Sequence, residues 1–517
     1  MQHIRCETVA GAARPGANNQ TRTQELTATR FAERVDTTDP YTADPQARGA
    51  LSRLVVVSNR VPPPADKGAQ AGGLAVALSA ALHDRGGLWF GWSGRTAETE
   101  AECEEPTSRR EGNVDFLLVD LTKRDLEEYY SGFANRALWP LLHYRLDLAD
   151  YDRQDTSGYF RVNAFFARVL APMIRPDDVI WVQDYHLIPL AAELRSRGVK
   201  NRIGFFLHIP WPPPDVWFAM PVHRQLLHAF TTYDLVGFQT DYDAENFVSC
   251  LVREGLGREI RPGLFRAGGR EFRVGAFPIG IETEAFAAMA AAAADNPLVR
   301  RMKVGTTEHN LIIGVDRLDY SKGIDHRMLA YERFLKNNPA YHGEVVYLQV
   351  TPKSRSEVPE YADMQRQVAE TAGRINGAYG HLDWTPIRYV NRTIKRSTLA
   401  GLFRMSNVGL VTPLRDGMNL VAKEFVAAQN GDDPGVLVLS RFAGAARELN
   451  AAVLVNPYDL ENTANAIATA LSMPRAERVA RWREMFDQLL KNDVNHWCNS
   501  FLERLEAAPL SVLKAAS

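Results

Sequence analysis

The sequence has 517 residues, too many for one ordinary hydrophobic core, so we expect several domains. Charged residues make up 24% and hydrophobic residues 45%, as in globular proteins that do not span membranes. The 60 basic and 62 acidic residues leave a net charge of −2, which excludes a general binder of polyanions. We therefore expect neither nucleic acid nor a membrane as a partner, and any bound anion should be held by local Arg and Lys side chains.

The four cysteines are scattered and form no CxxC pair, which argues against a structural zinc site and against a disulfide scaffold. This pattern is typical of a reducing compartment, and we predict a cytoplasmic protein. No apolar run approaches the roughly 18 residues of a membrane helix. Residues 1–50 lack the apolar core of a signal peptide, and we predict that they form a disordered N-terminal extension.

A first series of short apolar runs predicts buried strands, each followed by a helical segment. The runs span residues 54–57, 179–182, 203–207 and 235–238. Strands that alternate with helices predict a parallel sheet with crossover helices. We therefore assign residues 51–290 to a first α/β domain.

A second series follows the alanine-rich stretch at 287–294. Its strands are expected at residues 311–315, 345–350, 408–411, 436–439 and 453–455. We assign residues 291–480 to a second α/β domain and predict two doubly wound Rossmann-like domains. The last helical stretch, about residues 475–508, carries large apolar residues near helical spacing, and its part over 481–510 should pack back on the first domain. Ligands of such sheets bind beyond the carboxyl ends of the strands.

The segment Asp319-Tyr320-Ser321-Lys322-Gly323 follows the first strand of the second series. Arg317 and Lys322 should then lie near the start of the next helix. Two cations and helix amide groups can bind a diphosphate and stabilise negative charge on it as it leaves. The alternative interpretation is a basic surface loop.

The segment Arg415–Glu424 is the most informative of the sequence. Asp416 falls at a strand-to-helix turn, where its carboxylate can accept hydrogen bonds from sugar hydroxyls, and Gly417 permits a close backbone approach. Residues 418–421 would present amide groups to a phosphate, and Glu424 could accept a ribose diol. The alternative is a capped helix with an aspartate near its start.

Other candidates lie at the ends of the remaining strands. Gly72 and Gly73 follow the first strand and suit either a phosphate-binding loop or a plain glycine turn, while the absence of GxGxxG and GxxxxGK[ST] motifs disfavours NAD, FAD and P-loop binding. Cations in both domains could hold a second anion: Arg60, Lys353 and Arg355.

Several aromatic and titratable residues have two interpretations. Trp92, Tyr130 and Trp139 suit either a sugar contact or the core. Asp184 and His208 each follow a buried strand, where they could bind a sugar hydroxyl, assist proton transfer or be structural. Two D-x-D triplets, at 150–152 and 241–243, could hold a metal, but helix capping is the simpler explanation, and we predict no metal site.

Taken together, several long strings resemble the trehalose-6-phosphate synthases, retaining enzymes of glycosyltransferase family 20 with the GT-B architecture of two Rossmann-like domains facing across a cleft. The resemblance covers about residues 52–505. The strings that carry it are Arg53–Arg60, Gly86–Gly94, Leu138–Pro140, Asp184–Leu187, Gly204–Pro210, Arg317–Gly323, Gly373–Gly377 and Arg415–Glu424.

The resemblance implies transfer of glucose from a nucleotide-glucose to glucose 6-phosphate with retention, without a cofactor. It makes the first domain the acceptor domain and the second the nucleotide-sugar domain. The implied catalytic residues are Arg317, Lys322, Asp416 and His208. Donor binding would also involve Gly72, Gly73, Ile394, Leu420, Val421, Ala422, Lys423 and Glu424. Glucose 6-phosphate would be held by Arg60, Tyr130, Asp184 and Arg355, with Trp139 selecting the anomer.

The usual donor of the family is UDP-glucose. Family members often have an aromatic residue where this chain has Ile394, so the wall of the base pocket should differ, and ADP-glucose and GDP-glucose stay open as donors. No DxDx[TV] phosphatase motif occurs, so we expect a separate trehalose-6-phosphate phosphatase downstream. A homo-oligomer is expected, and the loop over residues 62–73 would act as a lid. Three alternatives stay open: a transferase with another acceptor, a pyridoxal-phosphate phosphorylase and a catalytically silent sugar-phosphate sensor.

Overall fold

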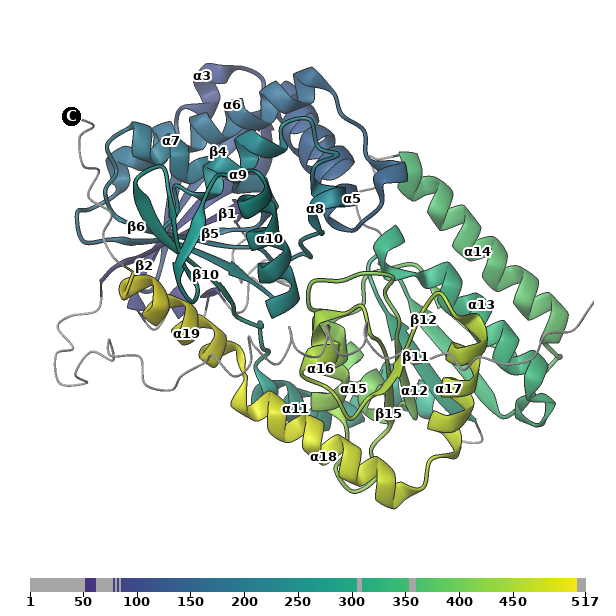
Figure 1. Cartoon of the computed structure of the whole chain (residues 1–517). Helices are drawn as coiled ribbons and strands as arrows, with labels where there is room; N and C mark the ends of the chain where they lie inside the picture. The colour runs from purple at the N-terminus through teal and green to yellow at the C-terminus, as the bar shows by residue number, and fades with distance from the viewer. Residues whose placement is uncertain are drawn as a thin grey trace, which may run out of the picture. The chain divides into compact units, whose positions relative to one another are not determined.

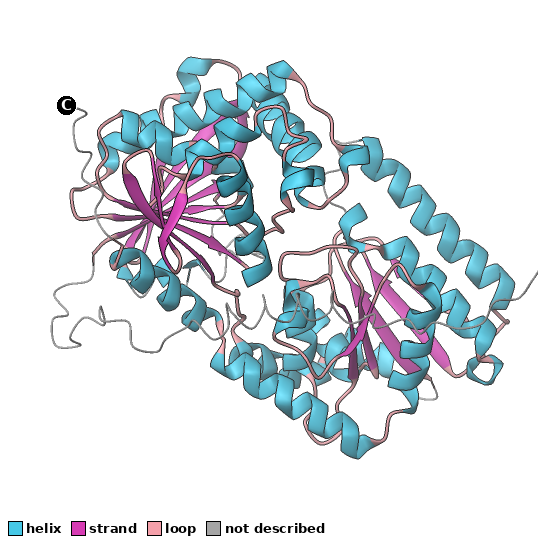
Figure 2. Cartoon of the chain, in the orientation of Figure 1, coloured by secondary structure: helices cyan, strands magenta, loops and turns pink. Residues whose placement is uncertain are grey.

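The computed structural model describes residues 52–61, 78–79, 81–82, 85–304, 309–352 and 359–508. Within these residues the chain builds two separate sheets of mainly parallel strands, each with helices on both faces (Figures 1 and 2). This confirms the predicted fold class of two doubly wound domains. The predicted disordered segment 1–50 and the predicted lid over 62–73 lie outside the described residues.

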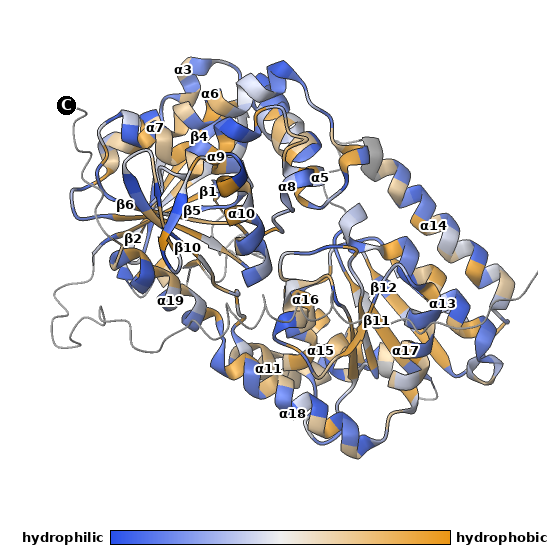
Figure 3. Ribbon diagram, viewed as in Figure 1, coloured by the Kyte–Doolittle hydropathy of each residue, from blue (hydrophilic) through white to orange (hydrophobic). Residues whose placement is uncertain are grey.

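The first sheet is built around β1 (Leu54–Arg60), whose apolar residues are buried on both faces. Leu54 and Val56 join one hydrophobic cluster, while Val55 and Val57 join another. This alternation follows from the two-residue period of a strand, and β-branched side chains suit a strand covered on both sides. Figure 3 shows the same apolar character along the central strands of both sheets, whereas β8 (Arg258–Arg261) at one edge of the first sheet is largely hydrophilic.

Among the described residues, β1 lies between β2 and β5, and both of these neighbours are parallel to it. The sheet order therefore reverses at the carboxyl end of β1. The strands follow one another across the sheet as β3 (Thr107–Glu111), β4 (Val114–Thr122), β2 (Gly87–Ala97), β1, β5 (Val179–Gln183), β6 (Arg202–Phe206), β7 (Leu235–Phe238), β10 (Arg270–Ala276), β9 (Leu264–Ala267) and β8 (Arg258–Arg261).

The second sheet is parallel throughout its described strands. Its order reverses between β11 and β14, the arrangement of a doubly wound sheet. Across the sheet the strands are β13 (Ile387–Val390), β12 (Val345–Val350), β11 (Asn310–Val315), β14 (Val408–Val411), β15 (Val436–Ser440) and β16 (Val453–Val455).

Helices complete two lobes, named here by their sheets. The helices of the first lobe are α3 (Glu100–Cys103), α4 (Lys123–Asp125), α5 (Trp139–Leu142), α6 (Arg153–Leu170), α7 (Leu190–Ser196), α8 (Pro214–Trp217), α9 (His223–Phe230) and α10 (Asp241–Arg253). Those of the second lobe are α11 (Thr283–Ala292), α12 (Pro297–Val304), α13 (Ile324–Asn337), α14 (Pro359–Tyr379), α15 (Arg396–Met405), α16 (Leu420–Ala428), α17 (Leu460–Ser472) and α18 (Arg475–Lys491). No described helix is long and apolar enough to cross a membrane.

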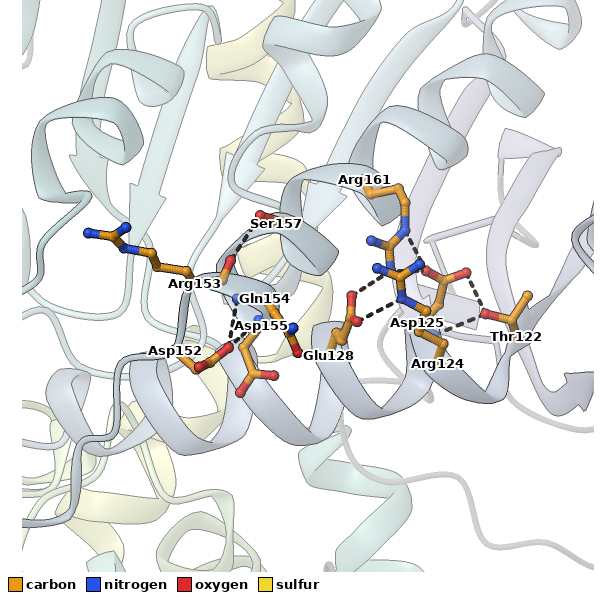
Figure 4. Close-up of polar contacts among 10 residues, drawn as sticks. All are labelled: Thr122, Arg124, Asp125, Glu128, Asp152, Arg153, Gln154, Asp155, Ser157 and Arg161. Carbon is orange, nitrogen blue, oxygen red and sulfur yellow. Dashed lines mark hydrogen bonds and ion pairs between the residues drawn. The ribbon is translucent and has the colours of Figure 1, made fainter.

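A π-helical segment, η3 (Leu126–Leu138), leads into α5 and packs along α6. Two ion pairs fix it there, because Arg161 of α6 contacts both Asp125 at 2.6 Å and Glu128 at 2.7 Å (Figure 4). The helices approach closely at glycines: a Cβ at Gly158 would lie 2.4 Å from the Glu128 Cβ. This packing matters for the site, because η3 carries Tyr130 and delivers the chain to Trp139.

The sequence predicted one continuous helical stretch at the C-terminal end of the second series, over about residues 475–508. The structure instead has two helices there. α18 ends at Lys491 and α19 (Val494–Glu506) begins after Asp493, whose carboxylate caps it by accepting the His496 N–H at 2.8 Å. The predicted boundary at 481 falls inside α18, which packs on α16 of the second lobe. α19 packs on β6 and β7 of the first sheet.

The rings of α19 are seated on the first sheet. Phe501 stacks on Trp181 with centroids 4.7 Å apart, and Trp497 meets Phe206 edge-on at 5.2 Å. Two strand glycines make room for Phe501, since a Cβ at Gly204 or Gly237 would come within 2.8 Å or 2.7 Å of the ring or its neighbour Leu505. The residues of α19 thus belong to a hydrophobic cluster that continues into the second lobe.

We expect Phe501→Ala to lower the free energy of unfolding by about 3–5 kcal/mol, because truncation of a buried aromatic side chain leaves a cavity. Chemical denaturation followed by tryptophan fluorescence measures the effect. Leu490→Ala is the control, because Leu490 is 40% exposed and its truncation should change stability by about 0.5 kcal/mol or less. Equal effects of the two substitutions would show that α19 does not stabilise the first lobe.

Candidate active site

The predicted site residues lie beyond the carboxyl ends of strands, at the point in each sheet where the strand order reverses. In the second sheet β11 is followed by Asp316–Gly323, and β14 is followed by Thr412–Asn419. In the first sheet Arg60 ends β1 and Asp184 follows β5. Ligands of doubly wound sheets bind at these reversal points, which makes both edges candidates for one site.

Lys322 and Asp416 are brought together across the second reversal point. The Lys322 ammonium forms an ion pair with the Asp416 carboxylate, and each side chain is only 12% exposed. Asn419 Nδ2 also donates to Asp416 Oδ2 at 3.0 Å. An ammonium group has three donors, so this pair leaves Lys322 able to contact an incoming phosphate as well.

A buried polar network supports the turn that carries Lys322. Arg327 of α13 is fully buried, pairs with Asp316 at 2.6 Å and donates to the Thr412 hydroxyl at 2.9 Å. Its guanidinium also donates to the Lys322 carbonyl at 3.3 Å. Burial raises the pKa of Asp316, and Arg327 opposes that rise. Since a guanidinium stays charged when buried, the network fixes the loops after β11 and β14 against each other.

Arg317 is exposed and reaches the first lobe. Its Cζ lies 5.9 Å from the ring centre of Trp139, which begins α5. The Trp139 ring is buried and packs on His143 at 4.2 Å and on Tyr185 at 5.6 Å. A cation predicted for the donor diphosphate and an aromatic residue predicted for the acceptor therefore meet where the lobes face each other.

His208 follows β6 and is oriented by Gln183, whose Oε1 lies 2.9 Å from His208 Nε2. Burial lowers the pKa of His208 to about 3, so the imidazole is neutral near pH 7. A neutral ring can donate a hydrogen bond to or accept one from a sugar hydroxyl, but it carries no charge to stabilise a diphosphate.

Asp184 has an unusual backbone conformation for a residue with a side chain, with φ 74° and ψ 166°. Such a conformation costs about 1–3 kcal/mol and marks functional sites more often than ordinary turns. The Asp184 carboxylate accepts the backbone N–H of His208 at 3.2 Å. The two residues after β5 and β6 are thereby held together at the first reversal point.

Arg60 and Tyr130 form the outer part of the first-lobe edge. The Arg60 guanidinium is exposed and lies over the Trp92 ring, 5.6 Å from its centre. Tyr130 stacks on His186 at 5.7 Å with an interplanar angle of 11°. Trp92 also contacts Tyr130, at 6.1 Å, so these residues form one aromatic wall with a cation on it.

The two lobes touch through backbone atoms at Gly417. A Cβ at this position would lie 2.2 Å from the His208 carbonyl oxygen and 2.9 Å from the Ile209 Cα. The close approach that the sequence predicted at Gly417 is therefore made to the opposite lobe. It brings the loop of Asp416 directly against the loop of His208.

The start of α16 carries the other predicted donor contacts. Asn419 caps the helix from a left-handed conformation, φ 73°, by accepting the Ala422 N–H, and Leu420 and Val421 form the first turn. Glu424 faces Arg396 at 3.5 Å; burial raises the pKa of Glu424, and Arg396 opposes that rise. Ile394 is partly buried against the core of the second lobe.

The Lys423 side chain is engaged within the protein, and its predicted part in donor binding stays a prediction. Its ammonium is fully buried, donates to the Ile279 carbonyl at 2.7 Å and pairs with Glu448 at 2.6 Å. These contacts point it away from open surface, toward the chain segment that joins the lobes. Among the predicted residues, Gly72, Gly73 and Arg355 lie outside the described part of the chain, as does Lys353.

Three residues of the site were not singled out in the sequence analysis, Gln183, Arg327 and Arg396, and neither was the capping role of Asn419. Asn419 carried a signal, because asparagine before an apolar run is typical of a helix cap.

The D-x-D residues serve local structure: Asp152 caps α6, while Asp243 is buried and accepts the Trp211 N–H at 2.9 Å. Thr240, not Asp241, caps α10. Within the described ranges no group of three or more His, Cys, Asp or Glu is placed to hold a metal.

Comparison with known proteins decides the family. The model of glycosyltransferase family 20 matches residues 52–507. The chain belongs to glycosyltransferase family 20. It is therefore an enzyme of the glycosyltransferase class, with the GT-B architecture predicted from the sequence.

Individual family 20 proteins are similar over nearly their whole length. A trehalose-6-phosphate synthase of Sinorhizobium fredii is 62% identical over 461 residues, 89% of this chain and 99% of its own. The solved structure of an α,α-trehalose-phosphate synthase (UDP-forming) from Burkholderia xenovorans in complex with glucose 6-phosphate has a TM-score of 0.84 and 48% identity, covering 88% of this chain and 100% of its own. The Escherichia coli structure bound with UDP-2-fluoro glucose has a TM-score of 0.85 and 49% identity, covering 88% and 99%.

The contact at Gly417 predicts a sharp mutational effect on this family 20 chain. We expect Gly417→Ala to lower the rate of glycosyl transfer by tenfold or more, because the added methyl group forces the Asp416 and His208 loops apart. Initial rates at saturating substrates measure the effect. Gly373→Ala is the matched control, since a Cβ there meets no atom within 4 Å. A wild-type rate for Gly417→Ala would show that glycosyl transfer does not require the close contact between the Asp416 and His208 loops.

Proposed function

We propose that this chain is an α,α-trehalose-6-phosphate synthase that transfers glucose from UDP-glucose to glucose 6-phosphate with retention. The observation that carries the proposal is that strand-end loops of the two lobes meet, at Gly417 with His208 and at Arg317 with Trp139, and that both lobes carry cations at these strand ends. Arg317 and Lys322 stand on the second lobe, and Arg60 stands on the first. A reaction between two phosphorylated sugars needs such a pair of anion sites. The ligands of the two solved relatives support the choice of substrates.

In the proposed reaction Lys322 and Arg317 hold the donor diphosphate and stabilise the charge that grows on it as the bond to the glucose C1 breaks. The anomeric hydroxyl of glucose 6-phosphate forms the new bond to C1 on the same face. Its proton passes to the departing diphosphate, so no enzyme nucleophile is required. The products are α,α-trehalose 6-phosphate and UDP.

The other residues are assigned to position the two sugars. Asp416 and neutral His208, held together by the Gly417 contact, would bind the hydroxyls of the transferred glucose. Arg60, Tyr130 and Asp184 would hold glucose 6-phosphate, with Trp139 near its anomeric carbon. Glu424 would accept the ribose diol, in competition with its pairing to Arg396.

Uridine is the proposed donor base, with adenine and guanine as the alternatives. Ile394 is aliphatic, so the base would contact an aliphatic side chain rather than stack on an aromatic ring. The cytoplasmic location, the homo-oligomer, the downstream phosphatase and the domain boundaries stay predictions.

Release of the nucleoside diphosphate tests the proposed function. Purified protein should release UDP only when UDP-glucose and glucose 6-phosphate are both present, with one disaccharide phosphate formed per UDP. NMR of the product should show an α,α-1,1 linkage. Parallel reactions with ADP-glucose and GDP-glucose rank the donors, and glucose replaces glucose 6-phosphate as the control acceptor. The proposal fails if no donor supports turnover, or if release does not depend on the acceptor.

Arg60 provides a test of the acceptor site. We expect Arg60→Gln to raise the KM for glucose 6-phosphate about tenfold or more, since a charge-assisted hydrogen bond to phosphate contributes about 1.5–3 kcal/mol. The KM for UDP-glucose should change less than about threefold. Arg110→Gln is the control, because Arg110 is 70% exposed and pairs with Asp115 near the amino end of β4, at the opposite edge of the sheet from Arg60. A larger effect on UDP-glucose than on glucose 6-phosphate would contradict the assignment.

A further inference from the structure

A cavity lies next to the candidate site, and no step of the proposed reaction uses it. Its volume is about 570 Å³, within the range of small-molecule sites. We call it the arginine pocket, because Arg415, Arg441 and Arg447 line it. Of the site residues described above, Asp416 and Gly417 line it, and neither Arg317, Lys322 nor His208 does.

The walls of the arginine pocket belong to both lobes. Tyr242 and Asp243, at the start of α10, come from the first lobe, while the three arginines follow β14 and β15 of the second. Arg415 bridges the lobes: its Cζ lies 4.0 Å from the ring centre of Tyr144 in the first lobe and 5.1 Å from that of Phe442 in the second.

The positive charge of the pocket is only partly offset, since Arg415 and Arg447 act on the Asp243 carboxyl and Arg447 also acts on that of Glu245. Within the described part of the chain, none of the three guanidinium groups has a hydrogen bond or an ion pair, although most other arginines do. The two carboxylates that line the pocket are already engaged. Asp416 pairs with Lys322, and Asp243 accepts from Trp211 N–H at 2.9 Å and from the Thr240 hydroxyl.

Burial raises the pKa of Asp243 to about 6, so this carboxylate stays mainly ionised near pH 7 and is the lining carboxylate that has no close cationic partner. Arg415 and Arg447 act in the opposite direction on the same carboxyl. Three arginines and at most one unshared carboxylate leave a positive cavity. Guanidinium groups match the geometry of phosphate oxygens better than that of smaller anions.

From this geometry we propose that the arginine pocket binds a phosphomonoester dianion, at a site separate from both substrate phosphates. Tyr242 and Phe442 give the pocket an aromatic rim, which suits an organic group attached to the phosphate. Because its walls come from both lobes, a ligand there holds Arg415 and Arg447 to the start of α10.

The test measures phosphate binding with the catalytic anion sites blocked. The background protein carries Arg60→Gln and is saturated with UDP, so that neither predicted substrate site competes. Inorganic phosphate should still bind by calorimetry with one site per chain and should raise the unfolding temperature. Adding Arg441→Gln and Arg447→Gln should weaken binding at least tenfold. The matched control is Arg483→Gln, an exposed arginine of α18, which should leave binding unchanged.

Two further arms keep the test decisive. Arg441→Lys with Arg447→Lys keeps the charge and should retain phosphate binding within about tenfold, even if the glutamine variants fold poorly. Ribose 5-phosphate replaces phosphate in the second arm: tighter binding identifies a sugar phosphate as the ligand, and equal binding identifies free phosphate. The proposal is overturned if the background protein binds no phosphate, or if the glutamine variants bind it as well as the control does.

Discussion

The contact between Gly417 and the carbonyl of His208 is the constraint on which the candidate site depends. Each residue lies in a loop that follows a buried parallel strand, and the two strands belong to different sheets. With no side chain between them, the two backbones touch. The side chains next to Gly417 and His208 are thereby directed into the same space. The candidate donor-binding residues of one lobe and acceptor-binding residues of the other form a single site because this contact brings their loops together.

The charged groups around this contact are held by different means on the two sides. On the second lobe, a fully buried Arg327 ties Asp316, Thr412 and the Lys322 carbonyl into one network. Removal of either Arg327 or Asp316 would leave the other as a buried, unpaired charge, which is strongly destabilising. The ion pair therefore holds the loops in one geometry. The first lobe instead relies on stacked rings and on the ion pairs of Arg161 in α6 with Asp125 in α4 and Glu128 in η3. There Arg60 is exposed and Tyr130 is half-buried.

Local sequence signals predicted the parts of the molecule that are decided locally. β-branched runs such as Leu54–Val57 identify buried strands whatever surrounds them, and the polar residues after them must then lie at the sheet edge. Asp416, Lys322 and Asp184 were found in this way. The contacts of the Lys423 side chain could not be predicted, because its partners, Ile279 and Glu448, are distant in sequence and are brought near only by the packing of the lobes. The π-helical form of η3 also depends on tertiary packing. The break before α19 did carry a local signal, because Asp493 is a typical helix-capping residue.

The chain passes between the lobes twice, and the two passages lie side by side. The first runs through Ile279–Ile281 and the second through Asn492–Val494, where the Val494 N–H donates to the Ile281 carbonyl at 3.1 Å. Gly280 allows the crossing, since a Cβ there would lie 2.3 Å from the Asn492 carbonyl oxygen. Two adjacent connections act as one hinge. Such a hinge permits the lobes to rotate apart about a single axis and resists sliding of one lobe along the other. An enzyme built in this way can open its cleft to exchange substrates and still return Gly417 to the same position on each closure.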